Sequence, residues 1–117
     1  MQNMILEKSM DFAVRIVKMY QYLSEEKKEF IMSKQLMRSG TSVGANVREA
    51  SQGQSKKDFT AKMSISLKEA IESEYWLELM YKTGYLTTEQ YESVRADCKE
   101  LIKLLTSIIK TAKSNEQ

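Results

Sequence analysis

Apolar residues recur at spacings of three and four along most of the 117-residue chain, with charged residues on the opposite side of each stretch. This is the period of an amphipathic α-helix. It predicts helices over about residues 4–24 and 34–51, a third helix that Ser55 caps and Gly84 ends, and a fourth that begins after Thr87. Serine and threonine favour the first position of a helix, and glycine favours the position just past its end.

The third predicted helix carries the clearest seam. Its inward positions step by four and three without a break, which is the heptad spacing of closely packed helices. These positions are Phe59, Met63, Ser66, Ala70, Ser73, Leu77 and Met80. Because three of them are small, we expect a neighbouring helix to lie close to this seam.

Two further signals concern the ends of the helices. Ser33 is predicted to cap the second helix, and Thr87 with Gln90 has the spacing of a capping box at the fourth. The charged segment 25–29, EEKKE, is interpreted as a solvated turn and an ordinary surface.

Four helices with short connections pack as an antiparallel, up-and-down bundle. The absence of proline and the content of only four glycines support an all-α chain. Neither a linker nor an internal repeat divides the sequence, so a single four-helix domain is predicted over residues 1–117.

Gly40 and Gly44 stand four residues apart, on one face of the second predicted helix. A face without side chains lets another backbone approach, which favours a tight helix crossing. The alternative is a glycine-rich loop that holds an anion. The tight crossing is preferred, because the stretch lacks the GK[ST] ending of a phosphate-binding loop and follows no predicted strand.

Trp76, Ile102 and Ile109 lie beside the predicted seams, so the third and fourth helices carry a broad apolar face. An exposed apolar patch would mark an interface. A wide stripe that faces the core would look the same in the sequence. Both interpretations stay open at this point.

The chain offers little for catalysis. It contains no histidine, which is the commonest general base and metal ligand, and Cys98 is its single cysteine. Cys98 falls in an apolar register and is predicted to be a buried thiol, because no histidine is available to activate it. We therefore expect a non-enzymatic protein with no metal site and no cofactor.

No apolar run approaches the ~20 residues that cross a membrane, and no signal peptide is recognisable at residues 1–12. We expect a cytoplasmic protein without a membrane partner.

Charge is unevenly spread although the net charge is only +2. Residues 34–68 hold seven basic side chains against Glu49 and Asp58, a local charge of +5, and residues 69–78 hold four acidic side chains and no basic one. The seven basic residues are Lys34, Arg38, Arg48, Lys56, Lys57, Lys62 and Lys68. This basic zone could bind phosphates, meet the acidic zone of another copy in a ring, or be a plain solvated surface.

Two runs, SGTSVGANVREA and KKDFTAKMSISLKEAIESEYWLELM, resemble the bacterial four-helix proteins encoded in intervening sequences of 23S ribosomal RNA genes, also labelled S23 ribosomal proteins. The resemblance implies a bundle that assembles into a ring, a pentamer. These proteins resemble in turn the accessory variability proteins of retroelements, which are basic rings that partner a reverse transcriptase and nucleic acid; the net charge of this chain is more balanced than theirs.

The residues that match the family motifs are interpreted first as residues of packing and assembly. They are Arg38, Asn46, Glu49, Lys57, Lys68, Glu69, Glu74, Tyr75 and Trp76, to which the packing argument adds Gly40 and Gly44. The resulting hypothesis is a non-enzymatic, ring-forming bundle that contacts RNA or DNA through the basic zone. The alternative is a protein-binding adaptor without nucleic acid.

Overall fold

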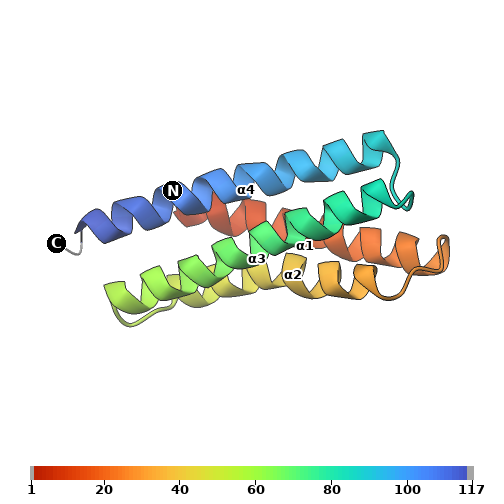
Figure 1. Ribbon diagram of the computed structural model, residues 1–117. Helices are drawn as coiled ribbons and strands as arrows, with labels where there is room; N and C mark the ends of the chain where they lie inside the picture. The colour runs from red at the N-terminus through yellow and green to blue at the C-terminus, as the bar shows by residue number, and fades with distance from the viewer. Residues whose placement is uncertain (1, 116–117) are drawn as a thin grey trace.

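Four α-helices joined by short connections make up the computed structural model, which describes residues 2–115 (Figure 1). They are α1 (Gln2–Glu25), α2 (Met32–Ser51), α3 (Lys56–Lys82) and α4 (Thr88–Asn115). Consecutive helices run in opposite directions, so the all-α, antiparallel bundle is confirmed. The α2–α3 connection and both ends of the chain lie at one end of the bundle, and the α1–α2 and α3–α4 connections lie at the other.

The core runs along the axis of a molecule that measures 49 × 20 × 20 Å. Every helix contributes fully buried side chains to it, such as Phe12 from α1, Val43 from α2, Leu77 from α3 and Leu101 from α4. The predicted α3 seam is buried at all but its first position. The periodic pattern of the sequence therefore identified the inward faces correctly.

α1 and α2 cross at Gly40 and Gly44, two positions of α2 that carry no side chain. A Cβ built on Gly40 would lie 2.8 Å from two side-chain carbons of Ile16, and one built on Gly44 would lie 3.2 Å from the backbone oxygen of Ser9. The two glycines thus face α1 inside a continuous helix and form no anion-binding loop.

α2 and α3 are joined by buried hydroxyl groups. The Oγ atoms of Ser39 and Ser73 lie 2.8 Å apart, and Ser66 Oγ donates a hydrogen bond of 2.8 Å to the carbonyl oxygen of Val43. These serines are completely buried. The small residues of the seam therefore let α3 approach the backbone of α2, as their pattern predicts.

Most of the predicted helix ends are confirmed. Ser55 Oγ accepts a hydrogen bond of 3.0 Å from the Asp58 amide, and Thr87 and Gln90 bond reciprocally at 2.9 and 3.1 Å. Gly84 adopts a φ of 89°, in the left-handed region that glycine enters without strain.

The start of α2 differs from the prediction. Ser33 is not its N-cap: the helix begins at Met32, and the carboxylate of Glu29 accepts hydrogen bonds from the amides of Ile31, Met32 and Ser33 at 2.7–3.0 Å. Glu29 is only 7% exposed, so the interpretation of segment 25–29 as a plain solvated turn was wrong for this residue. A glutamate three residues before a helix is not a standard cap signal, because its reach depends on how the turn folds back.

Candidate functional site

The seven basic residues of the 34–68 zone do not form one surface. Lys34 lies in the first turn of α2, while Lys56 and Lys57 begin α3 at the opposite end of the bundle. A helix rises about 1.5 Å per residue, so Lys34 and Arg48 stand roughly 20 Å apart along α2. The antiparallel fold therefore spreads the seven basic residues along the length of the bundle.

Arg38, in the middle of α2, is engaged by two acidic residues of α3. Its guanidinium donates to Glu69 Oε2 at 2.7 Å and also to Glu72 Oε2. The hydrogen bond with Glu72, with the nearby charge of Glu69, raises the pKa of Arg38 above its ordinary value. This cation therefore bridges α2 and α3.

The same carboxylate holds the single tryptophan. Trp76 Nε1 donates to Glu72 Oε2 at 2.9 Å, and this bond and the one from Arg38 lower the pKa of Glu72. The ring of Tyr75 meets the Trp76 ring edge-on, with centroids 5.0 Å apart. The fold thus brings together four residues that match the family motifs, Arg38, Glu69, Tyr75 and Trp76, around a glutamate that the sequence analysis did not single out.

Four of the basic residues gather where α2 ends and α3 begins. Lys62 Nζ lies 2.8 Å from Glu49 Oε1, a contact that raises the pKa of Lys62. Arg48, Lys56 and Lys57 are exposed and form no ion pair with any residue in the described range 2–115. We call these three residues the connection cations.

Lys68 occupies a different surface, the outward side of α3. It is flanked by three exposed apolar side chains, Ile65, Ile71 and Tyr75, which are 43%, 51% and 57% exposed. Spacings of three and four place all four residues on one helical face. We call this surface the α3 outer face.

The apolar residues Trp76, Ile102 and Ile109, which the sequence suggested as an interface or a core stripe, do not lie on the α3 outer face. Ile109 is buried, and Trp76 and Ile102 are half-buried against the core. For these three residues the structure favours the wide core-facing stripe over an interface.

The remaining family-motif residues make contacts within the bundle. Glu74 Oε2 lies 3.9 Å from both Arg95 Nε and Lys99 Nζ, which links α3 to α4. Asn46 Nδ2 donates 2.8 Å to the Ser42 carbonyl on its own helix. Glu74 and Asn46 therefore both have partners within a single chain.

Sequence reasoning missed the polar contacts between the first and last helices. Arg15 donates to Asp97 Oδ2 at 2.6 Å and to the Ser93 hydroxyl at 2.8 Å, and Lys8 Nζ lies 3.1 Å from Glu100 Oε1. The sequence has no signal for such pairs, because only partners three or four residues apart on one helix are readable from spacing.

Cys98 is buried, and its Sγ lies 3.2 Å from the Ala70 carbonyl oxygen. Burial raises the pKa of the thiol to about 12, so the group stays protonated and is a poor nucleophile. The prediction of a buried core thiol is confirmed.

Within residues 2–115, no three acidic or cysteine side chains come together in a way that would hold a metal ion. None of the helices in that range is both long and apolar enough to cross a membrane.

Comparison with known proteins agrees with the fold and the motifs. Residues 1–107 match the family described as 23S rRNA-intervening sequence protein. The structure is similar to the crystal structure of a protein with unknown function from the S23 ribosomal protein family of Bacteroides thetaiotaomicron, with 60% identity, a TM-score of 0.92, and coverage of 93% of this chain and 97% of that one. Curated proteins gave no match. The chain therefore belongs to the family of 23S rRNA-intervening sequence proteins.

Proposed function

We propose that this protein is a non-enzymatic helical bundle that assembles with copies of itself and binds RNA or DNA through the connection cations. One observation carries the nucleic-acid part: Arg48, Lys56 and Lys57 are exposed together at one end of the bundle and have no acidic partner within residues 2–115. Cations in this state can neutralise phosphates, which supply most of the affinity for nucleic acid.

The other members of the basic zone are expected to contribute less. Arg38 and Lys62 already contact carboxylates, and an RNA phosphate would have to compete with Glu69, Glu72 or Glu49 for them. Lys34 is at the opposite end of the bundle and adds only long-range attraction, which salt screens.

The experiment is a salt series with a fluorescein-labelled structured RNA, followed by fluorescence anisotropy from about 50 to about 200 mM salt. We expect the wild-type affinity to fall steeply with salt. The double variant Lys56→Gln with Lys57→Gln should reduce the slope of log K against log salt by about two, since each lost phosphate contact removes ~0.9.

A matched control exists at the other end of the molecule. Lys27 and Lys28 are also adjacent, exposed lysines, on the α1–α2 connection. Their double glutamine variant should keep the wild-type slope. Equal losses in both double variants, or no loss in the Lys56 and Lys57 variant, would show that the connection cations are not the contact.

Self-assembly is supported by the α3 outer face. Ile65, Ile71 and Tyr75 are large, exposed and on one side of one helix, a feature that often marks an interface. The family resemblance implies a ring of five. Sedimentation should then give a mass about five times the 13.6 kDa of one chain.

The assembly proposal is tested with a pair of variants. Ile71→Asp with Tyr75→Asp should reduce the mass to that of one chain, because two buried charges oppose the contact. Ile31→Asp is the control: Ile31 is 78% exposed but lies on the α1–α2 connection, so the mass should not change. A wild-type protein with the mass of one chain at micromolar concentration would contradict assembly.

The second candidate function is a protein-binding adaptor, and the α3 outer face also favours it. If the wild type is a single chain and does not bind RNA, this face is available to a different protein. The partner should then be retained from nuclease-treated lysate by the wild type and by Ile31→Asp, and lost by Ile71→Asp with Tyr75→Asp.

A further inference from the structure

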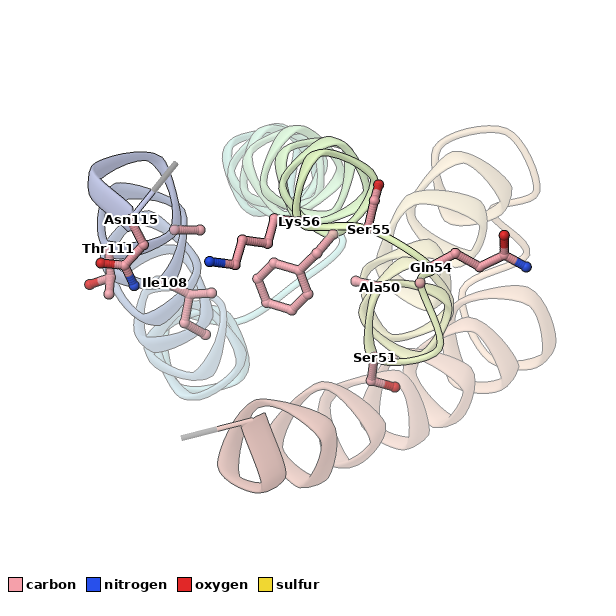
Figure 2. A pocket seen from close by; sticks show the side chains of 11 residues that line it. Ala50, Ser51, Gln54, Ser55, Lys56, Ile108, Thr111 and Asn115 are labelled. Carbon is pink, nitrogen blue, oxygen red and sulfur yellow. The ribbon is translucent and has the colours of Figure 1, made fainter. Parts of the chain in front are cut away.

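A cavity opens at the end of the bundle where the α2–α3 connection faces the last turns of α4 (Figure 2). Its volume is about 550 Å³. That volume is in the range of pockets that hold small organic molecules. The α1–α2 and α3–α4 connections lie at the other end of the molecule.

The inner wall of this cavity is apolar. Phe59 of α3, Ile108 and Ala112 of α4, and Ala50 of α2 line it. Phe59 and Ala112 are half-buried, while Ile108 and Ala50 are buried. A ligand that filled the cavity would therefore remove apolar surface of both partners from water, which favours binding.

The mouth of the cavity is polar and cationic. Figure 2 shows the Lys56 side chain reaching from α3 toward α4, with its amine directed at the side where Thr111 and Asn115 lie. Among residues 2–115, no acidic side chain lines the cavity and none forms an ion pair with Lys56. Asp58 lines a separate depression with Arg48.

We propose that this cavity binds a small amphipathic carboxylate, with its hydrocarbon part against Phe59 and Ile108 and its carboxylate at the amine of Lys56. The apolar wall and Lys56, the one lysine or arginine that lines this cavity within residues 2–115, match the two halves of such a ligand. Thr111 and Asn115 add polar groups to the lining of the cavity on the side of α4. Contact with nucleic acid phosphates would use Lys56 but not the apolar wall, so the two proposed sites share this one residue and differ in the others.

The first probe is 1-anilinonaphthalene-8-sulfonate, an aromatic body with one anionic group whose fluorescence rises in apolar surroundings. We expect saturable binding of one probe per chain. Decanoate should displace the probe, and decanol, which has the same chain without the charge, should displace it less well. Equal displacement by both would overturn the role of the cation.

Three variants locate the site. Lys56→Gln should weaken probe binding up to about fivefold, as loss of an exposed charge contact does. Lys57→Gln is the matched control, since Lys57 is adjacent and exposed but does not line the cavity. Ala112→Trp should abolish binding by filling the cavity, while circular dichroism verifies that the bundle is intact.

The outcomes also separate this proposal from the RNA proposal. Lys57→Gln should weaken RNA binding and leave the probe unaffected, and Ala112→Trp should do the reverse. A probe that still binds to Ala112→Trp and is lost from Ile71→Asp with Tyr75→Asp would lie on the α3 outer face and would overturn the cavity. Absence of saturable binding to the wild type would overturn it as well.

Discussion

Gly40 of α2 and Ile16 of α1 meet so closely that a Cβ on Gly40 would lie 2.8 Å from both Cγ1 and Cγ2 of Ile16. Ile16 is completely buried, and these two carbons are next to its own Cβ, so they cannot turn aside easily. The separation of the two helices is therefore set by the absence of one methyl group.

Gly40→Ala should lower the free energy of unfolding by about 1–2 kcal/mol, measured by urea denaturation at fixed protein concentration. Overpacking of a core costs about 1–3 kcal/mol, and the higher helix propensity of alanine returns up to ~1 kcal/mol. In an Ile16→Ala background the two clashing carbons are gone, so Gly40→Ala should become neutral or stabilising. A similar loss in both backgrounds would rule out the clash as the cause.

Glu29→Gln should lower the free energy of unfolding by about 1–2 kcal/mol at neutral pH, because the carboxylate caps the first amides of α2. Burial acts to raise the pKa of Glu29, but hydrogen bonds from the backbone of Ser33, Met32 and Ile31 outweigh it, and the pKa lies below its ordinary value. The stabilisation is therefore complete above the unfolded pKa of about 4.3 and is lost as pH falls through the folded pKa.

The measurement is urea denaturation of wild type and variant across acid pH, where the two should converge. Glu26→Gln is the control, since Glu26 is exposed and its carboxylate forms no ion pair or hydrogen bond within residues 2–115. A gap between wild type and Glu29→Gln that stays constant with pH would contradict a charged cap.

Fluorescence of Trp76, the single tryptophan, should report the protonation of Glu72. Because the bonds from Trp76 and Arg38 lower the pKa of Glu72, the acid transition should lie below the ordinary range of glutamate. Arg38→Gln should move the midpoint upward and reduce stability by roughly 0.5–1 kcal/mol, as expected for a partly exposed pair. Glu72→Gln should remove the transition, and persistence of the transition would assign it to another group.

Cys98 should react very slowly with iodoacetamide in the folded protein at pH 8. A thiol pKa of about 12 leaves roughly a thousandfold less thiolate than an ordinary cysteine, and the group is also buried. Mass spectrometry should show full labelling in urea and little without it. Equal rates in both conditions would mean that the part of α4 around Cys98 opens readily.

Local features of the sequence predicted the fold well. The α3 seam, the caps at Ser55 and Thr87 and the turn at Gly84 were readable because each depends on neighbours three or four residues away. The tight crossing was also readable, because two glycines on one helical face leave few alternatives.

The candidate site was less predictable, since it depends on which helices become neighbours. Charge counting placed Arg38 with the other basic residues, but packing of α2 on α3 sets it against Glu69 and Glu72. Likewise, Lys56 and Thr111 line one cavity only because the first turn of α3 and the last turns of α4 lie at the same end of the bundle. These relationships involve residues 31 to 55 positions apart, for which spacing carries no signal.

The buried serines between α2 and α3, Ser39, Ser66 and Ser73, fix the position of α3 along the axis of α2. Sliding α3 by one turn would break both cross-helix hydrogen bonds and bring Leu77 to the position of Ser73, against Ser39, where the close approach leaves no room for it. The observed alignment is therefore favoured over this slide by one turn. The alignment of α2 with α3 determines which acidic residues lie next to Arg38 and which basic residues lie near the α2–α3 connection. The buried serine hydroxyls therefore influence the charge pattern on the surface of the molecule.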